Sequence, residues 1–439
     1  MGNPAEALAE YIREHTVHIG VILLLAAYPG LHHILVNTPI GEELALFLPR
    51  VETMVSVFYF GLFAISFDFI SGYTGYLSFG HAAFYGTGGY LVVLIANERI
   101  PFLPSTTPFM ISLAIVGVVA VGLAILIGAV SFRLTGVYFA MITLGFAQVL
   151  YVFIRNWDYV GSNPRSGISV LGHPEGFRIG VPFVDSLNVQ IASADFIGQT
   201  FENLFGLGIN LSASEVSYYM IGVVVVLCYF VMKRMLHSPF GQVMVAIREN
   251  EERARAIGYN TFRYKLAAFA ISGFFAAVAG GLFAGYRRSV TPENSFFFLV
   301  TGDALLAAII GGFGTLAGPF FGRLFHEFLR EFLSDQAGGP HIDVGELGLL
   351  PYLRRSLGEG ALNTEIYNEF TVGQFIETFL NGHESLYLGI LFVLFVLYVP
   401  EGILGTLRKK IGGKIEKKLP EKFKRAVKKR VRGAQTKSE

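Results

Sequence analysis

Chemically versatile side chains occur at a few isolated positions in this chain, each within a long apolar or glycine-rich run. Gln148 and Asp303 interrupt apolar segments, and His81 lies among glycines. We find no His, Asp and Glu cluster with metal-ligand spacing, no nucleophile beside a candidate base, and no GxxxxGK[ST] phosphate loop. The sequence therefore argues against an enzyme, and we expect no metal, no catalytic residue and no bound cofactor.

Charge is concentrated in one run inside the apolar part of the chain, residues 238–265, reading SPFGQVMVAIRENEERARAIGYNTFRYK. Ser238 followed by Pro239 predicts a helix start with the serine side chain as its cap. Charges surround the later turns on nearly every side, and Gly258 predicts a left-handed end. A helix that is polar all round has no core to join. We expect it either to be solvated or to dock on another protein.

Membrane helices must position these polar side chains, because the amino-acid composition lies outside the range of soluble proteins. Hydrophobic residues make up 53% of the chain and charged residues 15%. Several apolar runs reach the roughly 20 residues that a bilayer-spanning helix needs. We expect an all-α polytopic membrane protein with one transmembrane domain at residues 17–406, after a cytoplasmic segment at residues 1–16.

The apolar runs predict about ten spans, some interrupted, with nine as the alternative count. An even number places both chain ends on the same side of the membrane. One span carries Gly273, Ala277, Gly281 and Gly285 at four-residue intervals, which predicts a close-packing face. The spans are expected near residues 17–37, 51–70, 71–90, 108–131, 136–155, 215–235, 266–286 and 384–404, with two more in 297–333 broken at the glycines 311–314.

Two polar inserts and a basic tail complete the organisation. The inserts, residues 156–214 and 334–383, are acidic and are expected outside the cell. The first either carries function, such as docking of a binding protein, or is disordered. Residues 408–439 hold 14 Lys and Arg against 3 acids, while the rest of the chain holds 20 against 30. The positive-inside rule places the tail, residues 407–439, in the cytoplasm. It either lies on the anionic inner leaflet or is disordered.

Residues 71–90, SGYTGYLSFGHAAFYGTGGY, contain six glycines. An interior glycine costs a helix about 1 kcal/mol relative to alanine, so close helix packing or an interrupted helix must explain them. This run, GVYFAMITLGFAQV at 136–149 and IIGGFGTLAGPFFG at 309–322 resemble the permease subunits of ATP-binding-cassette (ABC) importers for branched-chain amino acids, a type that also includes urea and short-amide permeases. The resemblance covers most of residues 60–405 outside the two inserts.

The charged run adds a second resemblance. Glu252 to Gly258 fits the pattern Glu-Ala-Ala, three residues, Gly of the cytoplasmic coupling loop in ABC importer permeases, except that Arg253 replaces the first alanine. The resemblance implies that residues 238–264 form a cytoplasmic coupling loop that seats in a groove on an ATPase subunit. Our candidates for that contact are Arg248, Glu249, Glu251, Glu252, Arg253, Ala254 and Gly258.

The family resemblance also implies a translocation path, which we expect to be lined by small and aromatic residues. His81 is alternatively a helix-packing histidine, and Gln148 alternatively makes a helix–helix hydrogen bond. Asp303 either faces the path or makes a structural hydrogen bond or ion pair, because an acid in an apolar run is costly otherwise. The full set of candidates is Tyr73, Gly75, His81, Gln148 and Asp303.

The partners that the resemblance implies are two cytoplasmic ATPases that bind the ATP, a second related permease, an extracytoplasmic binding protein and the lipid bilayer, without nucleic acid. The implied location is a prokaryotic cell membrane, crossed several times, with both termini in the cytoplasm. Two alternatives remain: the same machinery importing urea or short amides, and an ion-coupled secondary transporter. The second suits the interrupted glycine-rich segments, but few carboxylates lie within the spans.

Overall fold

The computed structural model describes residues 20–33 and 48–333, apart from 162, 173, 182–183, 191–199 and 205–208, then short stretches between 362 and 374, and most of 384–406. The predicted segment 1–16, most of the insert 334–383 and the tail 407–439 lie outside the described residues. Helices dominate what is described, and the strands form only two-stranded sheets. The predicted all-α membrane class is confirmed.

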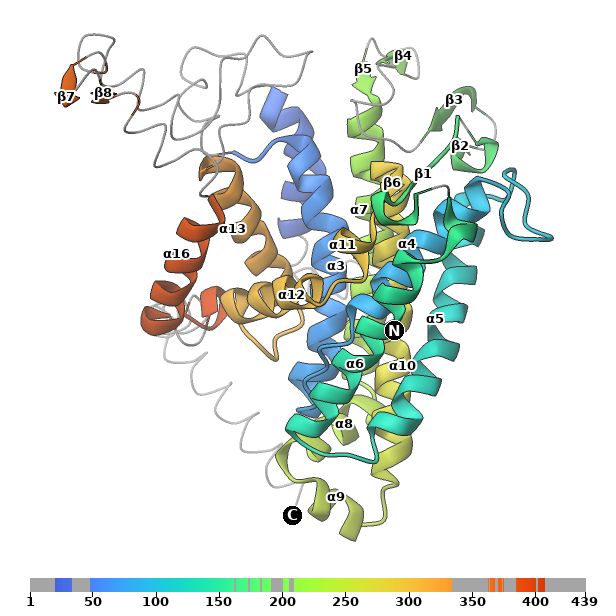
Figure 1. Cartoon of the computed structure of the whole chain (residues 1–439), viewed down its shortest axis with the longest axis vertical. Helices are drawn as coiled ribbons and strands as arrows, with labels where there is room; N and C mark the ends of the chain where they lie inside the picture. The colour runs from blue at the N-terminus through green and yellow to red at the C-terminus, as the bar shows by residue number, and fades with distance from the viewer. Residues whose placement is uncertain are drawn as a thin grey trace, which may run out of the picture.

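The elements follow one another as a series of helices with small hairpins between them (Figure 1). A short apolar helix, Gly20–His33, comes first. The remaining helices are α3 (Val51–Thr74), α4 (Ala82–Ala96), α5 (Phe109–Ser131), α6 (Val137–Arg155), α7 (Ala213–Leu236), α8 (Pro239–Glu249), α9 (Glu251–Ala256), α10 (Thr261–Arg287), α11 (Pro292–Ser295), α12 (Phe298–Gly311), α13 (Gly318–Leu333) and α16 (Glu384–Tyr398). The antiparallel pairs are β1 (Ile168–Ser169) with β6 (Ser289–Val290), β2 (Arg178–Val181) with β3 (Val184–Gln190), β4 (Thr200–Leu204) with β5 (Ile209–Ser212), and β7 (Glu365–Tyr367) with β8 (Phe370–Thr371).

Seven helices in the described part of the chain are long and apolar enough to cross a membrane, so the expected count of ten is not confirmed. The difference has three causes. In its described part, the expected span at 17–37 holds only the short helix Gly20–His33. The run 71–90 is divided between α3 and α4, because Gly75 adopts a left-handed conformation (φ 78°) that ends α3. The helix α13 is short and carries several charged residues, and so lacks the composition of a span.

The core is built around α10, which packs against α3, α4 and α5. Its small residues face α4 and α5. A Cβ on Gly280 would lie 1.9 Å from the Tyr85 carbonyl oxygen of α4, and one on Gly273 would lie 3.1 Å from Ala124 of α5. On the α4 side, a Cβ on Gly88 would lie 1.9 Å from the Ala277 carbonyl oxygen. The predicted close-packing face is confirmed.

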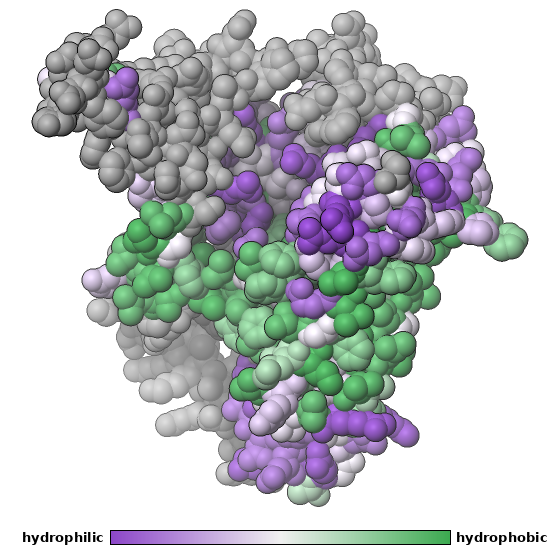
Figure 2. All heavy atoms as spheres, in the orientation of Figure 1, coloured by the Kyte–Doolittle hydropathy of each residue, from purple (hydrophilic) through white to green (hydrophobic). Residues whose placement is uncertain are grey.

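The helix bundle has two polar ends separated by an apolar band (Figures 1 and 2). One end carries α8 and α9, and we call it the α9 end. The described part of the first insert lies at the opposite end, where β1 pairs with β6, and we call this the insert end. Because α3 begins at the insert end and finishes beside α8, it connects the two.

Candidate functional site

Between Ser238 and Gly258 the chain forms two helices, α8 and α9, rather than the predicted single one. Asn250 has an extended backbone (φ −164°, ψ 104°) that ends α8, and its side chain caps α9 by accepting a 2.8 Å hydrogen bond from the Arg253 N–H. The predicted serine cap is also wrong, because the Ser238 hydroxyl donates to the Met235 carbonyl oxygen instead (2.6 Å). Gly258 is left-handed (φ 98°), as predicted.

The expectation that this run is polar all round is wrong as well. Val243 and Ile247 of α8 and Ala254 of α9 are buried together against Tyr76 and Tyr264. The apolar residues at 243 and 247 are one turn apart and face the bundle. The α8–α9 segment is therefore a packed part of the protein with one exposed face, and Ala254 belongs to its inner side.

Glu251 fixes α9 to the bundle. Its Oε1 lies 2.8 Å from the Lys265 Nζ and accepts a 2.9 Å hydrogen bond from the Thr261 hydroxyl, both in α10. Its Oε2 accepts a 2.5 Å hydrogen bond from Tyr76, which follows α3. Burial by itself raises the pKa of Glu251, but the hydrogen bonds from Lys265, Tyr76 and Thr261 outweigh it and lower the pKa to about 2. Glu251 is thus an internal ion-pair partner and not a surface contact.

Arg248 connects α8 to the end of α3. Its Nη1 donates a 2.8 Å hydrogen bond to the Gly72 carbonyl oxygen. Gly72 in turn lies against the α12–α13 loop, since a Cβ on it would lie 2.8 Å from the Gly314 Cα. Asp68 closes the junction by accepting a 2.8 Å hydrogen bond from the Gly314 N–H, while its Oδ2 is buried without a hydrogen-bond partner among the described residues. Three segments that are distant in the chain meet here.

The outer face of α9 mixes charge with apolar surface. Glu249, Glu252 and Arg253 are exposed. Beyond them Ile257 is 68% exposed and Tyr259 40% exposed, on either side of Gly258. Sequence reasoning missed these two residues. The glycine between them indicated a turn, and residues next to a turn are often exposed.

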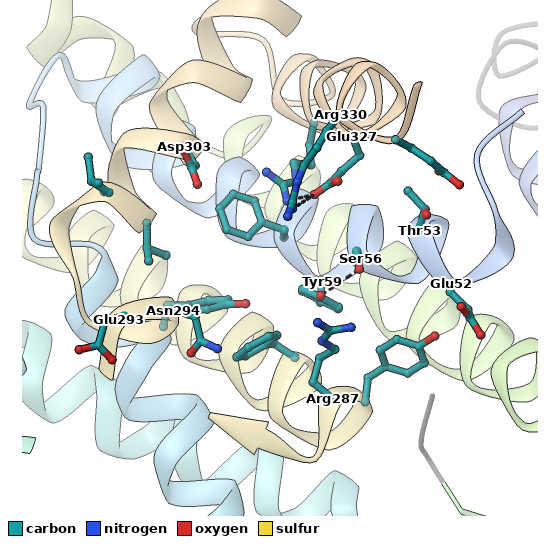
Figure 3. A pocket seen from close by; sticks show the side chains of 18 of the residues that line it. Glu52, Thr53, Ser56, Tyr59, Arg287, Glu293, Asn294, Asp303, Glu327 and Arg330 are labelled. Carbon is teal, nitrogen blue, oxygen red and sulfur yellow. Dashed lines mark hydrogen bonds and ion pairs between the residues drawn. The ribbon is translucent and has the colours of Figure 1, made fainter. Parts of the chain in front are cut away.

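A cavity of about 660 Å³ opens at the insert end between α3, α10, α11, α12 and α13 (Figure 3). Asp303, Glu327 and Arg330 come from α12 and α13 on one side of it, and Arg287 comes from the last turn of α10 on the other. Its wall includes aromatic rings from α3, α4 and α10, namely Tyr59, Phe60, Tyr85, Phe283 and Tyr286. The lining therefore combines both signs of charge with apolar surface.

Most charged groups that line this cavity have protein partners. Arg323 pairs with Glu327 on α13 and lies 4.0 Å from the ring centroid of Phe60. Arg50 lies 3.3 Å from Glu331. Asp303 and Arg287 differ, because neither side chain makes a hydrogen bond or ion pair with any described residue. Sequence reasoning identified Asp303 but missed Arg287, whose position at a helix end gave no distinct signal.

The five candidates for the translocation path do not lie together. Asp303 lines the cavity. Tyr73 and Gly75 lie at the α9 end, where a Cβ on Gly75 would be 3.3 Å from the Arg248 Cγ. His81 is buried between helices, with its Nε2 2.5 Å from the Ser272 hydroxyl, as its alternative packing role requires. Gln148 on α6 has an Nε2 without a hydrogen-bond partner among the described residues.

The described residues contain no group of three or more His, Cys, Asp or Glu side chains that could hold a metal ion. The site therefore consists of two parts. The α9 end presents an exposed, charged surface, and the insert end holds a cavity lined by charges of both signs.

Comparisons with known proteins agree with the resemblance in the sequence. A family model described as branched-chain amino acid transport system, permease component, matches residues 50–349. The chain is 30% identical over 298 residues to the high-affinity branched-chain amino acid transport system permease protein LivM of Escherichia coli (strain K12), covering 68% of this chain and 66% of that protein. It is 23% identical over 321 residues to LivH of the same organism, covering 71% of this chain and 93% of that protein. No solved structure matches the chain.

Proposed function

The chain belongs to the family of branched-chain amino acid transport system permease components, and we propose that it is the membrane-spanning permease subunit of an ATP-driven importer. Its role is to form half of a translocation path and to couple it to cytoplasmic ATPases. Because no phosphate loop occurs in the sequence, the energy comes from partner subunits that bind ATP.

One observation carries the coupling role: the α8–α9 segment is held rigidly on its inner side and is exposed and charged on its outer side. Glu251 and Lys265 fix α9 to α10, and Arg248 fixes α8 to α3. When a partner displaces α8 and α9, the rest of the bundle moves with them only if the two helices are attached to it. We assign docking to Glu249, Glu252, Arg253 and Gly258, together with Ile257 and Tyr259, and fastening to Arg248, Glu251 and Ala254.

The mechanism we propose is alternating access. When the ATPases close on ATP, α8 and α9 move with the groove that holds them. Arg248 transmits the movement to Gly72, whose backbone lies against Gly314 in the α12–α13 loop. Since α12 and α13 form one wall of the cavity, this displacement changes its shape at the opposite end.

The proposed partners are two ABC ATPases, a second permease and an extracytoplasmic binding protein. Similarity to both LivM and LivH of one organism supports pairing with a second, related permease. The proposed location is the prokaryotic cell membrane, with both termini and α9 in the cytoplasm and the first insert outside. That insert end is then the face that receives the binding protein.

The relatives' printed function favours branched-chain amino acids as the solute. Urea or short amides are the alternative for the same machinery, and the charges around the cavity disfavour them because these solutes are neutral. An ion-coupled transporter is the alternative from another class. Uptake that requires ATP and survives collapse of ion gradients excludes it.

The docking role is tested by Glu252→Lys in the complete complex. Reversing an exposed charge on α9 should weaken recovery of the ATPases with the tagged permease several-fold, while membrane insertion stays normal. Glu175→Lys, which reverses another exposed charge at the insert end, is the matched control. Equal recovery of ATPases with both variants would mean that docking lies elsewhere.

A further inference from the structure

We propose that the cavity at the insert end is a transient binding site for the amino acid zwitterion, in which Arg287 binds the carboxylate and Asp303 binds the ammonium group. This inference rests on the proposed transport function and assigns two residues to its solute. Asp303 was already among the sequence-based candidates for the path, whereas Arg287 was not.

The first argument is that the charged residues lining the cavity divide into those with a hydrogen-bond or ion-pair partner and those without one. The acids and arginines around the cavity make protein contacts, with these two exceptions. Glu293 accepts a 3.1 Å hydrogen bond from Tyr151, and Glu52 accepts a 3.2 Å hydrogen bond from Ser214. Arg287 and Asp303 alone among the described lining charges make no such contact with the described residues, so they are the groups available to a ligand.

The second argument is their placement. Arg287 ends α10 and Asp303 lies in the second turn of α12, so the two charges face the cavity from different helices (Figure 3). An acid in an apolar membrane helix is costly unless it is paired or faces a water-filled cavity. A zwitterion held between the two would satisfy both groups at once, since guanidinium binds carboxylate through paired hydrogen bonds.

The third argument is the remainder of the wall. The volume of about 660 Å³ falls within the range of roughly 300–1,000 Å³ that small-molecule sites occupy. Tyr59, Phe283 and Phe297 add aromatic surface between the charges. These rings would contact an aliphatic side chain, while Thr53, Ser56 and Asn294 add polar groups to the same wall.

Asp303 also marks a way out of the site. It lines a second cavity of about 390 Å³ between α12, α13 and α16, together with Arg323 and Arg330. The remaining lining of that second cavity is mainly apolar, from Leu306, Ile310, Leu388 and Phe392. Asp303, Arg323 and Arg330 therefore lie where the two spaces meet, and Asp303 is the acid among them.

The test uses the complete complex of both permeases, the ATPases and the binding protein in lipid vesicles, with ATP-dependent uptake of radiolabelled L-leucine. Arg287→Gln and Asp303→Asn should each lower uptake about tenfold at low leucine concentration, mainly through a higher KM. Arg287→Lys keeps the charge but not the paired hydrogen bonds, and should restore part of the uptake. Arg133→Gln and Arg234→Gln remove exposed charges outside the cavity, the first insert and the docking residues, and should behave as the wild type.

The outcomes separate the two proposals. If the wild-type complex shows no ATP-dependent leucine uptake, the proposed function fails. If the wild type transports leucine and both cavity variants match their controls, the zwitterion site is refuted. Assembly and basal ATP hydrolysis are measured for every variant. Should Arg287→Gln fail to assemble, the near-isosteric Asp303→Asn decides the question, and an unchanged KM there overturns the proposal.

Discussion

The two polar ends of this protein use charge in opposite ways. At the α9 end, Glu251 has contacts with Lys265, Tyr76, Thr261 and Arg255 within hydrogen-bond distance. In the cavity at the insert end, Asp303 and Arg287 have no such partner among the described residues. Both regions hold acids and bases inside a membrane protein, so composition alone does not distinguish them.

The difference separates the α9 end, where charges are held by internal contacts, from the cavity, where two charges have no partner among the described residues. Lys265 is 3% exposed, and its Nζ lies 4.4 Å from the ring centroid of Tyr76. A buried cation with a carboxylate and an aromatic ring around it has one favourable position. Arg287 and Asp303, by contrast, are exposed, so their charges remain accessible. The first arrangement suits transmission of force and the second suits transient binding.

The comparison is tested most severely by Lys265→Met. This change leaves Glu251 partly buried without its principal counter-charge, and the free energy of unfolding should fall by about 3 kcal/mol. Thermal unfolding of the detergent-purified protein measures it. Arg263→Met, two residues away on the same helix and exposed, should change stability little. If Arg263→Met lowered the free energy of unfolding as much as Lys265→Met, the Glu251–Lys265 pair would not be what holds α9 to α10.

The contribution of Glu251 to stability should depend little on pH near neutrality. The pKa of Glu251 lies near 2 in the folded protein, below its ordinary value of 4.5. A lowered carboxyl pKa stabilises the fold above pH 4.5, and that stabilisation disappears as pH falls from 4.5 toward 2. The stability difference between wild type and Glu251→Gln should therefore be constant from pH 8 to 6. A difference that shrinks within this range would show that Glu251 is not held as a carboxylate.

The smallest effect is expected in the cavity. Asp303→Asn removes a charge that has no partner among the described residues, so the free energy of unfolding should change by less than about 0.5 kcal/mol, while leucine uptake falls as described above. The same thermal unfolding assay measures this change. A loss comparable with that of Lys265→Met would make Asp303 structural and erase the contrast between the two regions.

Much of this architecture was predictable because it follows from local patterns. Apolar length predicts most of the spans, and four-residue spacing of small residues predicts the face that α10 presents to α5. Glycine content in residues 71–90 predicts an interruption, which Gly75 provides. The α8–α9 segment was found from its charge, but its division at Asn250 and its buried apolar face were not, because the side of a short helix that is buried depends on the bundle it packs against.

The sequence by itself determined that this is a polytopic membrane protein of a permease family, since hydrophobic length, glycine spacing and short motifs are properties of neighbouring residues. Tertiary structure decided which charges are satisfied. Glu251 and Lys265 are 14 positions apart, Arg248 and Gly72 are 176 apart, and Arg287 and Asp303 belong to different helices. Whether a carboxylate is an anchor or an open binding group depends on what packing brings within about 3 Å of it, and no local pattern encodes that distance.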